Sequence, residues 1–301
     1  MSRVRIPLSR PVIEDDDRRA IAEVLEGTVL SGGPVAQRLE ARFAERFGRD
    51  AALVSSGTAG LYLALRAAGV TEGEVITPAY GFVATLHAIR LAGATPRLVD
   101  VDPRSGVLTP DAVESAWRPT VRAVIPVQLF GTPVDVEAIA AVARERDAVV
   151  IEDSCEAIGT HCRGRAAGTI GDAGVFGFYP NKQMTMGEGG LVIGASEWVD
   201  RVRSLRNQGR TGPGLQFEGE GFNFRITELQ AALGLAQLER VDRWNEIRDR
   251  LARAYREDLS GVPGLALLPE TDPLDRRSWF TFPIFLGSRE TRDRVASHLA
   301  A

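Results

Sequence analysis

AALVSSGTAGLYLALRAAG, residues 51–69, holds the pattern from which the fold can be predicted. Its apolar run at 51–56 ends in small polar residues, and 57–69 has helical apolar spacing and a glycine stop. The same alternation continues along the chain. Strands are expected at 74–78, 96–102, 121–131 and 148–154, and helices at 82–93, 109–117 and 134–147. This rhythm indicates an α/β fold with a mostly parallel sheet that helices cover on both faces.

Two more strands are expected at 172–179 and 189–194, and two helical segments, 12–27 and 31–48, precede the sheet. After residue 195 the alternation of strands and helices ends. The later elements are a helix at 197–209, a glycine-rich loop at 212–223, a long helical stretch at 226–259 that bends or breaks near its middle, a strand-like run at 277–287 and a helix at 292–300. We therefore expect a large domain over 1–225, and a connecting helix with an incomplete small α+β domain over 226–301.

Composition narrows the class of protein. Of 301 residues, 44% are apolar and 25% charged, which is typical of a globular protein. A net charge of −4 without a basic run argues against nucleic-acid binding, and no apolar run is long enough to span a membrane. With no secretion signal, a cytoplasmic location is expected. Cys155 and Cys162 do not make a disulfide framework, and the adjacent His161 lacks zinc-ligand spacing, so no metal site is expected.

The stretch FGFYPNKQMTMGEGG, residues 176–190, contains the only lysine of the chain. Of the 36 Lys and Arg residues, all except Lys182 are arginine. An arginine side chain effectively never loses its proton, whereas a neutral lysine amine is a nucleophile that forms Schiff bases with carbonyls. Two interpretations stay open from composition: Lys182 is retained for covalent chemistry, or one lysine survived a codon bias by chance.

The junction SSGTAGL, residues 55–61, joins the first strand of the sheet to a helix. Gly57 lets the backbone approach a ligand closely, and Thr58 offers a hydroxyl and an amide at the helix N-terminus, where the helix dipole suits a phosphate. The alternative is a plain helix cap, in which Ser56 or Thr58 serves only the backbone. The residues of this junction, taken alone, favour the cap.

Three more side chains follow strand ends, where ligands bind in parallel sheets. Asp153 comes directly after an apolar strand, so its carboxylate needs a positive partner, either a protonated pyridine nitrogen or one of the many arginines. Glu156 would point the same way if a helical turn begins there. Phe82 is a platform for a flat ring or simply part of the core.

Together these features fit one cofactor. A phosphate cradle, a carboxylate at a strand end, an aromatic platform and a single lysine in a glycine-rich segment are what pyridoxal 5′-phosphate requires. The sequence also resembles the DegT/DnrJ/EryC1/StrS family of sugar aminotransferases, which has the type I fold of aspartate aminotransferase. The matching segments lie in family order over essentially the whole chain: 30–48, 55–65, 78–89, 93–102, 125–131, 151–159, 171–190 and 221–238.

The resemblance implies a role for each residue of the cofactor site. Lys182 forms the Schiff base with pyridoxal phosphate and moves the proton between cofactor and substrate. Asp153 pairs with the pyridine nitrogen, so that the ring acts as an electron sink. Gly57 and Thr58 hold the phosphate, and Phe82 stacks on the ring.

The same resemblance implies a homodimer with shared active sites. Asn223 is expected to reach the cofactor phosphate of the neighbouring subunit. Ser31 and Gly32 lie in a loop that is expected to face the substrate.

The sequence departs from the family pattern in three places. Gly177, in the cofactor site, replaces the serine with which many relatives hold the phosphate. Glu156 replaces a glutamine near the phenolic oxygen of the cofactor, and a carboxylate there repels that oxygen unless it is protonated or otherwise engaged. Family members continue past the position of Ala301, so the small domain is expected to be incomplete here.

The expected activity is transfer of an amino group from glutamate to a nucleotide-linked keto sugar. Amination of a keto-cyclitol in antibiotic biosynthesis is a close alternative. The family also contains sugar dehydratases, but those carry histidine at the position of Lys182. A regulatory protein that binds ligand without turnover is a third alternative, against which the presence of Lys182, Asp153 and Asn223 argues.

Overall fold

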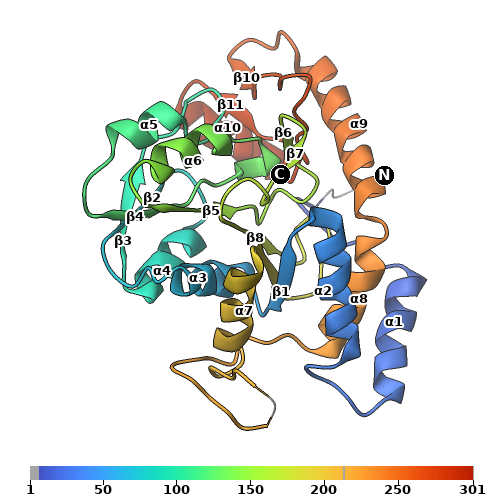
Figure 1. Cartoon of the computed structure of the whole chain (residues 1–301). Helices are drawn as coiled ribbons and strands as arrows, with labels where there is room; N and C mark the ends of the chain where they lie inside the picture. Colours follow the sequence, from blue (N-terminus) through green and yellow to red (C-terminus); the bar gives the residue numbers. More distant parts are fainter. Residues whose placement is uncertain (1–6, 213, 301) are drawn as a thin grey trace.

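The computed structural model describes residues 7–212 and 214–300, so the chain end at Ala301 lies outside the described residues (Figure 1). The helices are α1 (Asp15–Glu26), α2 (Pro34–Phe47), α3 (Gly57–Ala67), α4 (Val83–Ala92), α5 (Pro110–Ser115), α6 (Val136–Arg144), α7 (Ser196–Leu205), α8 (Glu228–Leu238), α9 (Val241–Leu259) and α10 (Arg289–Ala300). The strands are β1 (Asp50–Val54), β2 (Glu74–Pro78), β3 (Thr95–Val99), β4 (Val121–Val124), β5 (Val149–Asp153), β6 (His161–Cys162), β7 (Arg165–Ala166), β8 (Ala173–Gly177), β9 (Gly190–Gly194), β10 (Leu265–Leu267) and β11 (Ile284–Leu286).

A seven-stranded sheet forms the centre of the described chain, in the order β1-β9-β8-β5-β4-β2-β3. Strand β9 is antiparallel to both of its neighbours, and the other pairs are parallel. The prediction of a mostly parallel sheet is confirmed. Because the parallel strands share a direction, their carboxyl ends lie at one edge, where the loops after β2, β5 and β8 gather.

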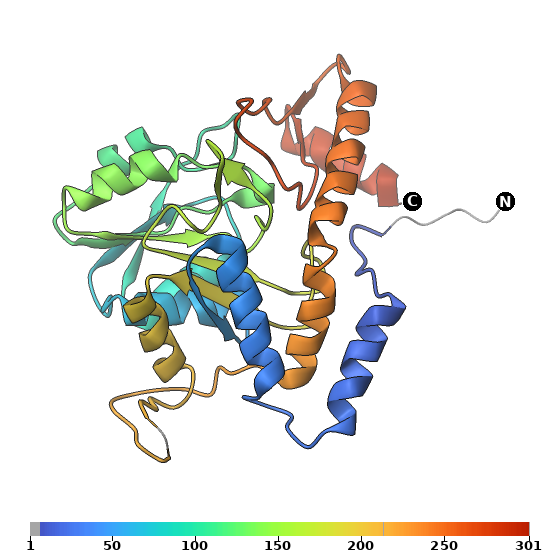
Figure 2. The ribbon, with the colours of Figure 1, turned by 45° about the vertical axis from the view of Figure 1, so that its right-hand side comes forward.

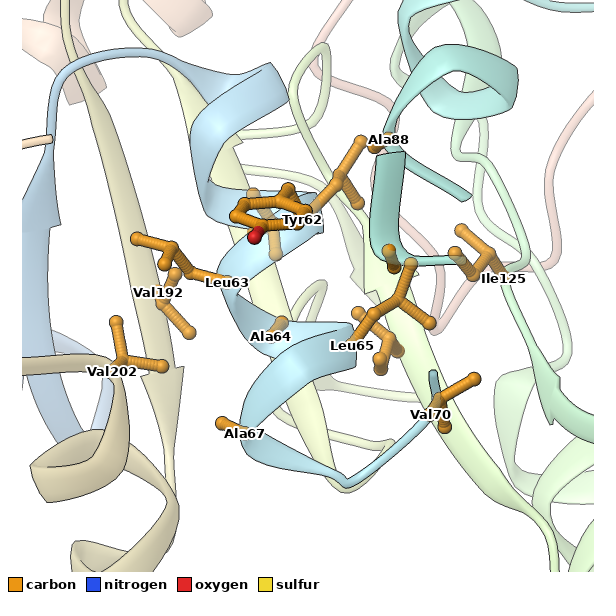
Figure 3. Close-up of a cluster of buried hydrophobic side chains, with 14 of the residues drawn as sticks. Tyr62, Leu63, Ala64, Leu65, Ala67, Val70, Ala88, Ile125, Val192 and Val202 are labelled. Carbon is orange, nitrogen blue, oxygen red and sulfur yellow. The ribbon is translucent and has the colours of Figure 1, made fainter. Parts of the chain in front are cut away.

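Helices cover both faces of this sheet because its strands are apolar on both sides. Along β1, Ala52 and Val54 belong to a core cluster with α3, α4 and α7, whereas Ala51 and Leu53 belong to a second cluster with α2. Helices α5 and α6 pack in a third cluster with β2, β4 and β5. In Figure 3, α3 is surrounded by Val192 of β9 and Val202 of α7 on one side and by Ala88 and Ile125 on the other.

The long helical stretch after residue 226 is divided, as predicted, into α8 and α9. Helix α8 packs against α1 and α2, and α9 continues to the small sheet of β10 and β11 (Figure 2). Arg240, at the break, pairs with the buried Asp17 of α1, so the junction is anchored to the N-terminal helix. The division of the chain into domains at 225/226 stays a prediction.

Several expected strands are shorter than predicted, and the two largest differences lie close to the lysine. In the run 121–131, strand β4 ends at Val124, a single bridge from Val127 to Asp153 follows, and the chain then turns at Phe130, which has a left-handed φ of 61°. The run 277–287 contains only β11, because Trp279 has a φ of 50° and interrupts the extended backbone. The hairpin β6–β7 and strand β10, which pairs antiparallel with β11, were not predicted. Within 7–212 and 214–300, no helix has both the length and the apolar character of a membrane span.

Candidate active site

Lys182 lies in the loop that joins β8 to β9. Met184 and Met186 anchor this loop in the core beside α2, and the amide of Met186 donates to the carbonyl of Phe178 at 3.0 Å. A Cβ on Gly190 would come within 2.4 Å of the Ser56 carbonyl oxygen, so the end of the GEGG segment must lack a side chain. The end of the loop therefore packs against the start of α3.

The amine of Lys182 lies between a carboxylate and an aromatic ring. Its Nζ is 3.4 Å from Oε1 of Glu156 and 4.2 Å from the ring centre of Phe280. The side chains of Lys182 and Glu156 are only 15% and 14% exposed. Such a shielded pair interacts more strongly than a surface ion pair, because less water screens it.

Glu156 is engaged from two directions, which answers the question raised by its replacement of the usual glutamine. Lys182 contacts Oε1, and the amide of Phe130 donates to Oε2 at 2.9 Å. Burial raises the pKa of Glu156 above its ordinary value, and Lys182 and the Phe130 amide act in the opposite direction. The left-handed turn at Phe130 is what points its amide at the carboxylate.

Asp153 ends β5 and is almost completely buried. The Thr85 hydroxyl donates to its Oδ2 at 2.6 Å, and the Cys155 amide donates to Oδ1 at 3.2 Å. Within the described residues no arginine forms an ion pair with Asp153, so the structural ion pair considered from sequence is not seen. A buried carboxylate with only two neutral donors has capacity for a cationic partner.

The start of α3 offers free donors. Ser56 caps the helix by accepting from the Ala59 amide at 3.1 Å, so the helix-cap interpretation holds for Ser56. In the described part of the chain, the amides of Gly57 and Thr58 have no hydrogen-bond partner. They lie at a helix N-terminus, where the dipole favours an anion.

Gly57 and Gly177 meet where α3 and β8 come together. A Cβ on Gly57 would come within 2.6 Å of Cys155 Sγ and 3.4 Å of Gly177 Cα. This contact brings the α3 junction to the carboxyl edge that carries Asp153 and Lys182. Burial, and then the charge of Asp153, raise the pKa of the Cys155 thiol well above its ordinary value, so this thiol is a packing residue and not a nucleophile.

Phe82 is not part of the core. It caps α4 with 71% of its surface exposed, and Tyr80 and Tyr179 are also about half exposed. An exposed aromatic ring at the edge where the strands end agrees with a platform for a flat ligand. Its stacking role stays a prediction.

The predicted substrate loop and Asn223 are held by contacts of their own. Ser31 pairs with Thr227 through a backbone bridge, and Gly32 has a left-handed φ of 66°. The buried Glu228 accepts the amides of residues 33, 35 and 36 at 2.8–3.2 Å and fixes this loop. Asn223 is exposed and bridges to Asn207. Within the described residues no hydrogen bond joins Asn223 to Lys182 or Glu156, and its role at the cofactor phosphate stays a prediction.

Four residues of the site were missed from sequence: Thr85, Phe130, Phe280 and the buried Ser278, whose hydroxyl accepts from Gln183 Nε2 next to Lys182. Thr85 could have been found, because α4 follows a strand whose carboxyl end lies at the same edge as Asp153. The other three had no such signal, since their positions depend on the left-handed turns at Phe130 and Trp279. Among the described residues, no group of three or more His, Cys, Asp or Glu side chains is placed to hold a metal ion.

The sequence profile of the DegT/DnrJ/EryC1/StrS aminotransferase family matches residues 11–301. The chain belongs to this family. The resemblance stated from the motifs is therefore confirmed over almost the whole sequence.

Relatives of known name support the same assignment. The GDP-perosamine synthase of Caulobacter vibrioides is 36% identical over 305 residues, which span 99% of this chain and 82% of that protein. The solved structure of S. venezuelae DesV in complex with a ketimine intermediate is 34% identical, with a TM-score of 0.89 over 97% of this chain and 82% of that one. The PLP form of the putative sugar aminotransferase Spr1654 from Streptococcus pneumoniae is 25% identical, with a TM-score of 0.92 over 98% and 82%.

Pyridoxal 5′-phosphate is the cofactor of this DegT-family chain. The residues present fit it. The free amides of Gly57 and Thr58 suit its phosphate, the buried carboxylate of Asp153 suits a protonated pyridine nitrogen, and the amine of Lys182 suits its aldehyde. The fold, an aspartate-aminotransferase-like α/β sheet, is also shown by the structural relatives.

Proposed function

We propose that this chain transfers an amino group from glutamate to the carbonyl carbon of a nucleotide-linked keto sugar. One observation carries the proposal: the only lysine of the chain lies shielded against Glu156, on the sheet edge that also carries the buried Asp153. A lysine in that position is the nucleophile and proton carrier that an aminotransferase needs.

Each residue has one task in this proposal. When bound, pyridoxal phosphate supplies an aldehyde and a ring that withdraws electrons from the substrate carbon. Lys182 Nζ provides the covalent attachment and then moves the proton at the substrate carbon. The Thr85 hydroxyl orients the carboxylate of Asp153, which would stabilise the protonated, positively charged pyridine nitrogen of the cofactor. The Gly57 and Thr58 amides and the Thr58 hydroxyl hold the phosphate, and Gly177, which offers no hydroxyl, leaves more of that task to them.

The choice of substrate follows from the relatives. A GDP-perosamine synthase is 36% identical to this chain. The keto sugar linked to GDP whose amination gives GDP-perosamine is therefore the first acceptor to test. If the chain aminates a keto-cyclitol and no nucleotide sugar, it is a keto-cyclitol aminotransferase and the proposal is wrong.

We further propose a homodimer that shares its active sites, with Asn223 of each chain reaching the phosphate in its neighbour and with Ser31 and Gly32 facing the substrate. Support comes from the exposed aromatic side chains Tyr80, Phe82 and Tyr179 near the site, because exposed apolar surface of this kind is typical of interfaces. We also propose a cytoplasmic location, since both cysteines are free thiols.

Borohydride trapping tests the cofactor site directly. The chain is mixed with pyridoxal phosphate, reduced, and digested with trypsin, and the adduct is located by mass spectrometry. We expect a yellow protein whose adduct lies on Lys182, and a Lys182→Arg variant without it. Glutamate should then bleach the visible band of the unreduced protein, and the keto sugar should restore it. An adduct confined to the N-terminal amine would contradict the proposed site.

A further inference from the structure

Phe280 comes from the part of the chain that follows α9, yet its ring contacts the catalytic loop. The ring centre lies 4.2 Å from Lys182 Nζ, while Glu156 Oε1 lies 3.4 Å from the same atom. A carboxylate and the face of an aromatic ring both attract an ammonium group, most strongly where water is excluded. The amine is therefore contacted by two attractive groups from segments far apart in the sequence.

The backbone of Phe280 is firmly held. Its amide donates to the carbonyl of Phe130 at 3.2 Å, and Arg248 of α9 donates to the carbonyls of Trp279 and Phe280 at 3.0 and 3.1 Å. The Trp279 indole donates to Asp249 of α9 at 3.3 Å, and Trp279 itself has a left-handed φ of 50°. Left-handed backbone is costly for a bulky residue, and here the surrounding contacts maintain it.

Ser278 connects the same segment to Glu156. Its fully buried hydroxyl accepts from Gln183 Nε2 and Thr160 Oγ1, both at 2.9 Å, and lies 3.3 Å from the carbonyl oxygen of Glu156. Gln183 Nε2 also donates to that carbonyl at 2.6 Å. The segment that places the Phe280 ring thus also fixes the backbone of Glu156 and the residue next to Lys182.

Phe280 does not behave as an ordinary core residue. It is partly exposed, and it lies outside the buried cluster that Trp279 forms with Ala252 and Leu268. Neighbouring Phe282 and Phe285 pack against that cluster instead. The ring of Phe280 is therefore directed to Lys182 while its neighbours fill the small core.

We propose that Glu156 and Phe280 form a seat for the free amine of Lys182, and that Phe280 is a positioning residue for the aminotransfer reaction. The importance of this amine seat rests on the proposed function. An aminotransferase lysine is bonded to the cofactor in one part of the cycle and free in the rest, so it must be kept in place while free. The seat shields the released amine and keeps it near the reacting carbon, which shortens the search for the next proton transfer.

The single lysine allows a direct test without turnover. The full chain, without added cofactor, is acetylated with an amine-reactive ester, and samples taken over time are digested with trypsin. Acetylation of Lys182 blocks cleavage there and leaves the peptide 166–201 intact, whereas the free lysine divides it. The ratio of these products gives the rate at which Lys182 reacts, and the acetylated N-terminus appears in a different peptide.

We expect Phe280→Leu to raise the acetylation rate about fivefold, because the ring that attracts the ammonium is lost. Phe280→Tyr keeps the ring face and should restore the wild-type rate. Phe285→Leu makes the same change in the small core and is the matched control, for which we expect no change. Glu156→Gln removes the charged partner and should also raise the rate.

The proposal is overturned if Phe280→Leu reacts at the wild-type rate, or if Phe285→Leu accelerates acetylation as much as Phe280→Leu does. Should Phe280→Leu fail to fold, Glu156→Gln decides: an unchanged rate rejects the seat. Repeating the experiment with pyridoxal phosphate separates the two proposals. Slower acetylation of Lys182 in the presence of pyridoxal phosphate supports the proposed function. An unchanged rate would contradict that function, but it would not alter the result for the amine seat, which is measured without the cofactor.

Discussion

At the scale of single residues, Glu156 is subject to two opposing effects. Burial disfavours its charged form, while Lys182 and the Phe130 amide favour it. The net result is a pKa above the ordinary value of 4.5. A glutamine at this position could not balance the charge of the lysine, so this chain combines a carboxylate with a shielded amine.

The raised pKa predicts how stability depends on pH. The folded chain binds the Glu156 proton more tightly than the unfolded chain does, so this group stabilises the fold below pH 4.5 and loses that contribution as the pH rises through the folded pKa. Glu156→Gln lacks this titration. We expect the free energy of unfolding of the wild type to fall by about 1 kcal/mol relative to the variant as the pH rises through that window. Urea unfolding of the cofactor-free chains measures it, and parallel pH curves would refute it.

Asp153 and Thr85 give a second prediction at this scale. Asp153→Asn removes the charge opposite the cofactor nitrogen and should lower kcat by about 100-fold. Thr85→Val removes only the orienting hydroxyl and should lower kcat by about 10-fold. Thr77→Val is the matched control, because the Thr77 hydroxyl serves only the Ile125 carbonyl. Equal kcat values for Thr85→Val and Thr77→Val would show that the Asp153 contact does not matter.

At the scale of elements, the N-terminus of α3 depends on close packing against β8. Gly57 lies against Cys155 and Gly177, and within the described residues its amide has no partner because it is in the first turn of the helix. The sequence pattern predicted the helix and placed Gly57 at its start. It did not predict that Cys155 would fill the space beside that glycine.

Gly57→Ala should therefore destabilise the chain by about 1–3 kcal/mol and weaken pyridoxal phosphate binding, because the new methyl group overlaps Cys155 Sγ. Adding Cys155→Ala removes that overlap and should recover most of the stability. Gly27→Ala is the control, since its Cβ would meet only the Val24 carbonyl oxygen at an ordinary 3.5 Å. Thermal unfolding and cofactor titration check this. A single Gly57→Ala variant as stable as the control would contradict the packing argument.

At the scale of the whole molecule, the site draws on segments that are far apart in the sequence. The sheet supplies Asp153, the β8–β9 loop supplies Lys182, and the segment after α9 supplies Phe280. Asn223, by contrast, is exposed, and within the described residues no hydrogen bond joins it to these three side chains. The proposed homodimer is what would bring it to a phosphate.

Mixing two inactive variants tests that arrangement. Lys182→Ala and Asn223→Ala homodimers should both have low activity, whereas a mixed dimer has one site with both residues intact if Asn223 acts across the interface. After unfolding and refolding together in equal amounts, about a quarter of wild-type activity should return. If Asn223 acts within its own chain, every site of the mixed dimer has a lesion and no activity returns. Light scattering measures the oligomeric state separately.

The sequence by itself determined the layers of the fold and the edge where the chemistry lies. Strands that are apolar on both faces, such as 51–54 and 149–151, must be covered by helices on both sides, and the parallel order places their carboxyl ends together. Lys182 could be identified from sequence because it is the only lysine, and Asp153 because it directly follows an apolar run. The family's segments then gave their roles, of which the cofactor is shown and the residue assignments stay predictions.

Only the tertiary structure decided which groups surround the lysine. Phe280 is 98 residues from Lys182 in the chain, and Phe130 is 26 residues from the Glu156 carboxylate that it contacts. Both contacts depend on left-handed turns at Phe130 and Trp279, where strand-like sequence predicted extended backbone. Local propensity does not encode such turns, because hydrogen bonds from distant segments, here Arg248 to the carbonyls of Trp279 and Phe280, offset their cost.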